Sequence, residues 1–194
     1  MKNSLLMKTD ATYTLNFLIY IQNIYLNQNR IEETGKFPYL PSKFVFKEEF
    51  EIKYKELWDE ILQKISNPHN IDMKIFYEEK DLFYQRLFVI SSDGLKKYNE
   101  IYKSFQVWWD SFAGRFSVER SVDGMGDNLY IDLANLLKEK GITPEKPLNI
   151  SLIYDECQLA NATISFYFAV LPVRDFFVKY KEMVLGLTGA FGNN

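Results

Sequence analysis

The clearest pattern in the chain spans residues 95–116 and reads LKKYNEIYKSFQVWWDSFAGRF. Apolar residues recur there at alternating steps of three and four positions, namely Leu95, Tyr98, Tyr102, Phe105, Trp109, Phe112 and Phe116. Because an α-helix has about 3.6 residues per turn, this spacing places all of them on one helical face. The pattern predicts a long central helix with an aromatic core face. It indicates an architecture and identifies no chemistry.

The length and composition are those of an ordinary globular protein. The chain has 194 residues, of which 47% are hydrophobic and 25% charged, enough apolar side chains to bury a core. Aromatic residues reach 16%, and large rings suit the space between packed helices. We therefore predict a single domain over residues 1–194, with loose termini at residues 1–11 and 189–194.

Charge and cysteine content restrict the possible partners and compartment. The formal net charge is -3, and no segment concentrates the basic residues that neutralise nucleic-acid phosphates. We expect no nucleic-acid partner. One cysteine, Cys157, cannot form an internal disulfide, which favours a reducing, cytoplasmic location. Frequent Lys, Asn, Ile and Tyr are typical of an AT-rich bacterial or phage genome.

A short apolar run lies near the start of the chain, at residues 15–21. Asn16 lies inside this run, and Gln22 and Asn23 end it, well short of the roughly 20 residues that a membrane span needs. No small-residue cleavage site follows, so it is a poor signal peptide. The sequence predicts no membrane association.

Three further helices precede the central one. Residues 12–27 are apolar on most sides, with Thr12 as the possible cap, which indicates a helix at the centre of its fold. Residues 47–65 are amphipathic and predict a helix. At the start of this segment, apolar and polar residues also nearly alternate, as in a strand. The helical period continues for four turns, however, and leaves only Ile52 among the apolar residues on the polar face. Residues 72–90 form the third helix, and Ser92 is placed to cap the central one.

Beyond Phe116 the helical pattern stops. Residues 117–128 contain Asp123-Gly124-Met125-Gly126-Asp127, which we interpret as a flexible polar loop. Asp127 then caps a short leucine-rich helix, and Gly141 ends that helix as a C′ residue.

Residues 148–171 allow two interpretations. As a helix, their apolar residues form a stripe and the helix-friendly segment 156–162 lies in the middle; as strands, residues 148–154 and 164–170 each alternate. We favour the helix, followed by a last helix after Pro172.

The predicted fold is all-α, an irregular bundle of about six helices around the aromatic helix. The alternative is α+β, with a small antiparallel hairpin near residues 148–171.

Acidic residues give a hypothesis of metal chemistry. The pairs Glu48/Glu51 and Glu56/Asp59 and the loop residues Asp123 and Asp127 are possible ligands, provided that three or more of them converge. However, lysines are interleaved with the helical pairs, as on a solvated face. The loop lacks the Asp/Asn rhythm of a calcium-binding loop, and a plain turn explains it better.

Nucleophilic catalysis has little support in the sequence. The chain has one histidine, His69, beside Pro68 in an expected loop, and one histidine cannot build a typical metal cluster. Cys157 falls in an apolar pattern, where a thiol is usually inert packing. We predict no catalytic residues, no metal and no cofactor.

The aromatic helix supplies the candidate binding residues, which are Tyr98, Tyr102, Phe105, Trp108 and Trp109. Trp108 points about 100° away from Trp109 on a helix, and is either core or an exposed anchor for a partner. The leading functional prediction is a non-catalytic protein-interaction domain (an inhibitor, immunity-type or regulatory partner). The alternatives are a small-molecule binder with a pocket lined by the aromatic residues, and a carboxylate- and metal-dependent hydrolase.

Overall fold

The computed structural model describes residues 5–29, 35–40, 43–66, 71–161 and 164–192. By their contacts these residues divide into two compact units. The helical unit comprises Thr12–Ser111 and Cys157–Asn161, and the sheet unit comprises Met1–Ala11, Phe112–Glu156 and Ala162–Asn194. Neither unit is continuous in the sequence. The chain as a whole is mostly helical and carries a small mixed sheet, so the all-α description is incomplete.

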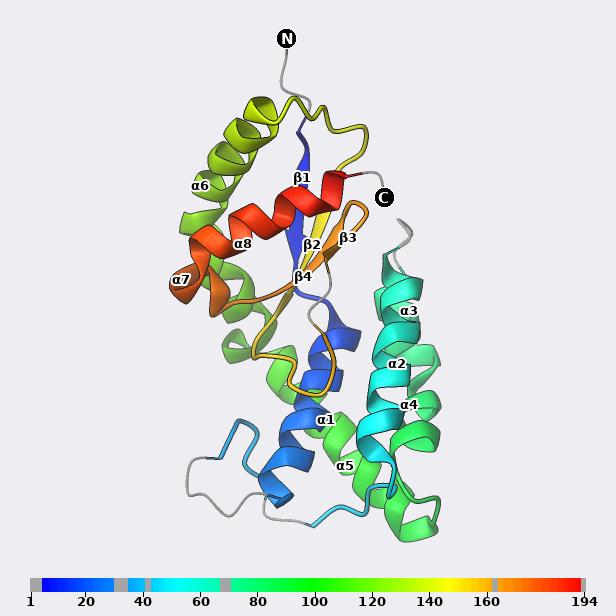
Figure 1. Cartoon of the computed structure of the whole chain (residues 1–194). Helices are drawn as coiled ribbons and strands as arrows, with labels where there is room; N and C mark the ends of the chain where they lie inside the picture. The colour runs from blue at the N-terminus through cyan, green and yellow to red at the C-terminus, as the bar shows by residue number, and fades with distance from the viewer. Residues whose placement is uncertain (1–4, 30–34, 41–42, 67–70, 162–163, 193–194) are drawn as a thin grey trace. The chain divides into compact units, whose positions relative to one another are not determined.

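The helical unit is built around α1 (Figure 1). Its elements are α1 (Tyr13–Asn29), α2 (Phe50–Ile65), α3 (Asp72–Glu78), α4 (Lys80–Leu87) and α5 (Ser92–Trp109). The helix α1 contacts α2, α3 and α5, which explains why it is apolar on most sides. The predicted helices at residues 12–27 and 47–65 are confirmed, and Ile52 is exposed as expected.

Aromatic rings form the core of the helical unit. Phe17 of α1 lies within 5.1–6.3 Å of five other rings, centroid to centroid, and those rings belong to Phe76, Phe83, Tyr98, Tyr102 and Phe105. Most of these pairs are edge-to-face or tilted, the arrangements that the charge distribution of the rings favours. The prediction of an aromatic core along the central helix is confirmed for this part of the stripe.

The N-terminus of α1 is held by a carboxylate from another helix. Asp72, the first residue of α3, accepts the backbone N–H groups of Tyr13 at 2.7 Å and Thr14 at 2.9 Å. The first N–H groups of a helix have no partner within the helix, so an acidic side chain is stabilising there. A carboxylate from another helix therefore caps α1 next to Thr12, the residue that the sequence predicts as the cap.

Two predicted helices differ in detail from the observed ones. The prediction of one helix over residues 72–90 is wrong, because the backbone at Glu79 (φ -102°, ψ 22°) separates α3 from α4. Because only one residue interrupts the helix, Phe76 and Phe83 stay in line. The spacing of the apolar residues therefore does not reveal the break. The cap of α5 is Ser91 rather than Ser92, since the Ser91 side chain accepts the N–H of Gly94 at 2.9 Å.

The stripe over residues 95–116 is buried only in its middle. Leu95, Phe112 and Phe116 are exposed, and α5 ends at Trp109. A short π-helical segment, η1 (Phe112–Phe116), follows, and its backbone departs from helical geometry at Gly114. The prediction that all seven apolar residues of the stripe share a core face is therefore wrong at both ends.

Among the described residues of the sheet unit, four strands form one sheet in the order β1-β2-β4-β3. The elements of this unit are β1 (Met7–Asp10), η1, α6 (Ser117–Glu139), β2 (Leu148–Ile153), β3 (Ile164–Ser165), β4 (Phe168–Pro172), α7 (Asp175–Val178), α8 (Tyr180–Leu187) and the 3₁₀ helix η2 (Thr188–Phe191). Strands β1, β2 and β4 are parallel, and β3 is antiparallel to β4. Helix α6 contacts β1, β2 and α8 (Figure 1).

The preferred helix over residues 148–171 is wrong. The strand alternative is correct for the presence of strands but wrong for their pairing, because β2 and β4 are parallel, with Ile150 opposite Ala169. Every residue of β4 and all but Asn149 of β2 are buried. Parallel strands covered on both faces lack a clean alternation, which is why the pattern was ambiguous. The single last helix is likewise divided, into α7 and α8.

The loose-terminus predictions are also corrected. Residues 7–10 form strand β1, paired with β2 from Met7 opposite Leu148 to Asp10 opposite Ser151. At the other end, η2 buries Ala190 and Phe191. Residues 1–4 and 193–194 lie outside the described residues.

The predicted loop at residues 117–128 is helical. It forms the first half of α6, including both Gly124 and Gly126. The predicted end of the helix at Gly141 is confirmed, and this residue has φ 68°. The N–H of Gly141 donates to the carbonyl of Lys138, and the N–H of Ile142 donates to the carbonyl of Leu137. These two hydrogen bonds form the Schellman motif that glycine favours. In the described residues, no helix combines the length and apolarity needed to cross a membrane.

Candidate functional site

Four of the five predicted binding residues belong to the buried face of α5. Tyr98, Phe105 and Trp109 are fully buried and Tyr102 nearly so. The hydroxyl of Tyr98 donates to the carbonyl of Lys80, and that of Tyr102 donates to the carbonyl of Phe76 at 2.9 Å. Burial raises the pKa of Tyr98 far above its usual value and that of Tyr102 to about 12. These phenols remain protonated and bonded within the core, where they serve packing.

Trp108, the fifth predicted residue, is half-buried at the surface of the helical unit. Its indole lies 4.7 Å from the ring of Phe37 and 5.9 Å from that of Tyr20, centroid to centroid. Phe105 and Trp109 flank it from within α5, at 5.9 and 5.3 Å. Four neighbouring rings therefore fix the indole while part of it stays accessible, the condition in which a tryptophan acts as a rigid anchor for a partner.

An apolar groove opens over Trp108, with a volume of about 610 Å³. It is lined by Tyr20, Phe37, Pro38, Tyr39, Leu40, Lys103, Ser104, Val107, Trp108 and Ser111. Side chains of Tyr39 and Val107 are 71% and 76% exposed, and Phe37 is 39% exposed. We call this site the Trp108 groove. Its walls come from Tyr20 of α1, from residues 37–40 of the segment that follows α1, and from the C-terminal half of α5 with Ser111 just beyond it.

Side-chain amides of α1 hold this segment in place. The Asn23 amide donates to the carbonyl of Phe37 at 2.8 Å, and the Asn27 amide donates to the carbonyl of Pro38 at 2.9 Å. The backbone N–H of Lys36 donates in turn to Oδ1 of Asn27 at 2.7 Å. Because the buried Asn23 amide and the half-buried Asn27 amide bond the backbone of residues 36–38, the groove wall is fixed before any ligand arrives.

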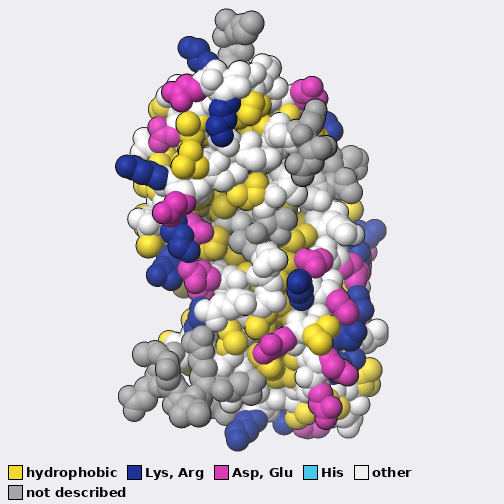
Figure 2. All heavy atoms as spheres, viewed as in Figure 1, with side chains coloured by type: hydrophobic (Ala, Val, Ile, Leu, Met, Phe, Trp, Pro, Cys, Tyr) yellow, Lys and Arg dark blue, Asp and Glu magenta, His cyan; other side chains and the backbone are white. Residues whose placement is uncertain are grey.

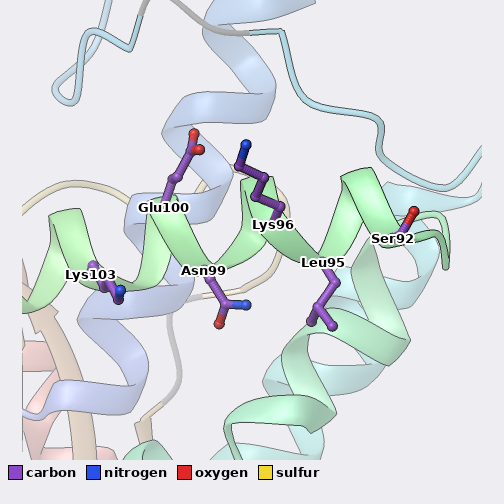
Figure 3. A pocket seen from close by; sticks show the side chains of 6 residues that line it. All are labelled: Ser92, Leu95, Lys96, Asn99, Glu100 and Lys103. Carbon is purple, nitrogen blue, oxygen red and sulfur yellow. The ribbon is translucent and has the colours of Figure 1, made fainter.

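Two further grooves adjoin the site on the exposed face of α5. One, of about 470 Å³, is lined by Ser92, Leu95, Lys96, Asn99, Glu100 and Lys103. In Figure 3, Lys96 and Glu100 project to one side of α5, and Leu95 and Asn99 to the other. This groove shares Lys103 with the Trp108 groove and shares Leu95 with a third groove, of about 550 Å³, beside α4. The outer face of α5 is therefore hollowed along most of its length.

Lys103 places a positive charge beside two of these grooves. It is exposed and lines two grooves, and within the described residues it has no ion pair. By contrast, Lys64 pairs with Glu60 and Glu79, and Arg86 pairs with Glu60. Figure 2 shows such mixed charges interleaved over the part of the surface formed by α2–α4. The Trp108 groove thus combines an apolar floor with a cation that pairs with no anionic side chain among the described residues.

Sequence reasoning identified Trp108 but missed its partners in the groove. Phe37 and Tyr39 flank Pro38 in the segment between the helices predicted at residues 12–27 and 47–65, and Val107 lies off the apolar stripe. Two aromatic residues on either side of a proline, outside any predicted helix, could have been recognised as candidate surface residues. Aromatic side chains in such a segment have few core positions in which to pack. Asn23 and Asn27, four positions apart on a helix that is apolar on most sides, were a second signal, since polar side chains that pack against the rest of a unit need bonding partners.

The acidic hypothesis gains no geometric support. Within the described residues, no three Asp, Glu, His or Cys side chains gather closely enough to hold a metal ion. Asp123 pairs with Arg120 at 2.6 Å on the surface of α6, and Glu56 pairs with Lys53 at 3.0 Å on α2. His69 lies outside the described residues.

Cys157 behaves as a packed thiol. Burial raises its pKa to about 11, although hydrogen bonds from its surroundings, including the Tyr54 hydroxyl 4.0 Å away, oppose that shift. The thiolate is the reactive form of cysteine, so this side chain is poorly nucleophilic near neutral pH.

Comparison with known proteins adds no functional information. No protein-family model, curated protein or solved structure matches this chain.

Proposed function

We propose that this chain is a non-catalytic protein-interaction module that binds a partner at the Trp108 groove. The observation that carries the proposal is the gathering of Phe37, Tyr39 and Val107, all exposed, around the half-buried Trp108. Exposed apolar clusters of this kind are typical of interaction sites. Pre-formed aromatic anchors also lose little freedom when a partner binds.

The other two functions have weaker support. A small-molecule pocket was expected between Tyr98, Tyr102, Phe105 and Trp109, but these rings pack against one another and against other core rings. The grooves around α5 are open to solvent rather than enclosed, whereas small-molecule sites bury most of their ligand. The carboxylates expected for a hydrolase do not converge within the described residues.

The proposal is tested by quantitative capture of partners from a lysate of the organism that encodes the chain. The groove variants are Val107→Asp and Tyr39→Ser, which change exposed side chains. The matched control is Ile52→Asp, because Ile52 is also an exposed apolar residue on a helix of the same unit, at 62%.

We expect at least one protein to be captured by the wild type and by Ile52→Asp, and to fall by roughly tenfold or more with either groove variant. Thermal unfolding of each variant confirms that the fold is retained. If every captured protein binds Val107→Asp and Tyr39→Ser as well as it binds the wild type, the groove is not the binding site and the proposal is refuted.

A further inference from the structure

The charge beside the Trp108 groove indicates what kind of segment the partner presents. Lys103 lines the edge of the groove and has no ion pair within the described residues, while the floor is formed by apolar rings. An apolar floor with one unpaired cation at its edge is complementary to an apolar side chain with a nearby carboxylate. Complementary charge at the rim of an interface selects partners and accelerates binding.

The spacing on α5 sets the distance between those two features of the partner. Lys103 and Val107 are one helical turn apart, which is about 6 Å at 1.5 Å per residue. In an extended peptide, residues two positions apart point to the same side and are separated by roughly 6.6 Å. A carboxylate two positions from the apolar anchor would therefore reach Lys103 while the anchor lies over Val107 and the adjoining ring of Trp108.

We propose that the Trp108 groove binds an extended peptide segment of the partner that carries an aromatic or branched aliphatic anchor and an Asp or Glu two positions away. This inference rests on the proposed function, since it names the ligand of the same groove. The anchor packs among Phe37, Tyr39 and Trp108, and the carboxylate pairs with the ammonium group of Lys103. Glu100, one turn before Lys103 on α5, disfavours a second acidic residue farther along the segment.

The test is a selection from a displayed library of random twelve-residue peptides against the full chain. The variants are Lys103→Glu, which reverses the charge at the groove, and Val107→Asp, which disrupts the floor. Lys74→Glu is the matched control, because Lys74 is an exposed lysine on another helix of the same unit.

We expect the wild type and Lys74→Glu to enrich the same peptides, with the anchor and the acidic residue two positions apart. Lys103→Glu should enrich Lys or Arg at that position instead. For one synthesised peptide, replacing its acidic residue by Asn should weaken binding to the wild type by about three- to tenfold and leave binding to Lys103→Glu unweakened. Added salt should reduce the difference.

The outcomes separate this inference from the proposed function. If peptides bind the wild type but not Val107→Asp, and show no acidic preference or no response to Lys103→Glu, the groove is functional and the inferred chemistry is wrong. If no peptide is enriched, or if the enriched ones bind Val107→Asp equally well, the linear-peptide inference is overturned. The capture experiment with folded partners then decides the proposed function independently.

Discussion

Asn27 of α1 and Lys36 form a closed pair of hydrogen bonds between a helix side chain and the backbone. The N–H of Lys36 donates to Oδ1 of Asn27 at 2.7 Å, and the Asn27 amide donates back to the Lys36 carbonyl. One side chain thereby imitates the pairing of a β-strand. These two hydrogen bonds hold the segment that supplies Phe37 and Tyr39. The geometry of the Trp108 groove therefore depends on Asn27, a residue that does not line the groove.

Removing this amide should loosen the groove wall. Asn27→Ala leaves the N–H of Lys36 and the carbonyls of Lys36 and Pro38 without their partner, which should lower the free energy of unfolding by about 1–3 kcal/mol in urea titrations. Asn99→Ala is the matched control, since Asn99 has no such bond within the described residues, and its effect should stay within about 0.5 kcal/mol. Equal effects of the two substitutions would show that the Asn27 bonds contribute no net stability.

The glycines of α6 should be replaceable with a gain in stability. A Cβ added at Gly124 or Gly126 meets nothing within 4 Å, and both residues are helical. Each Gly→Ala substitution should therefore raise the free energy of unfolding by about 0.5–1 kcal/mol, because alanine loses less backbone entropy in a helix. Gly141→Ala is the opposite case: at φ 68° an added Cβ is strained, at a cost of about 1–2 kcal/mol. Destabilisation by Gly124→Ala or Gly126→Ala would show that residues 117–128 are not helical in solution.

The ion pair between Glu60 and Arg86 should make stability depend on pH. Burial tends to raise the pKa of Glu60, but hydrogen bonds from Arg86 and Lys64 outweigh it and lower that pKa below its usual value. A carboxyl group whose pKa is lowered by folding stabilises the protein above its unfolded pKa, about 4.3, and loses that contribution as the pH falls through the folded value. The Oε2–Nη2 distance is 2.6 Å, but both side chains are about one-third exposed, at 34% and 36%, so the effect is modest.

A double-mutant cycle with Glu60→Gln and Arg86→Gln should give a coupling of roughly 0.3–1 kcal/mol near pH 7. That coupling should decline when the pH is lowered below about 4. Urea titrations at several pH values provide the measurement. A coupling that stays constant over this range would mean that the Glu60 carboxylate is not what Arg86 stabilises.

Cys157 should react slowly with thiol reagents. With a pKa of about 11 against about 8.5 for an unfolded thiol, the thiolate population near pH 8 is roughly 200-fold smaller in the folded chain. Reaction with a chromogenic disulfide should therefore be slower by about that factor than in denaturant, and its rate should keep rising with pH beyond about 9. A fast reaction at neutral pH would indicate that the thiol is accessible and activated, and would return Cys157 to the list of candidate functional residues.

The helical unit was the more predictable half of the fold. Its helices carry long apolar periods, and the residues Phe17, Phe76 and Phe105 sit where those periods place them. Strand β1 offered no such signal, because its sequence MKTD has one apolar residue and its partner strand lies far along the chain. The tight turn between β3 and β4 also has no sequence signal. It contains Tyr167 at φ 56°, a conformation in which glycine or asparagine is usual.

The candidate site was predictable in one residue only. Helical spacing separated Trp108 from the core stripe and allowed it to be an exposed anchor. The groove itself needs Phe37 and Tyr39, whose position depends on Asn23 and Asn27 reaching across from α1. No local period encodes a contact between a helix side chain and a segment outside the helix, so only the structure brings these residues together.

The parallel pairing of β1 with β2 has a consequence for biosynthesis. Residue 7 lies opposite residue 148, so during translation the first strand leaves the ribosome long before its partner exists. The intervening helices can collapse early around their rings, since their contacts are more local, while the sheet must wait until β2 and β4 have been synthesised. Chains truncated before β2 should therefore leave β1 as an unpaired edge that is prone to aggregation.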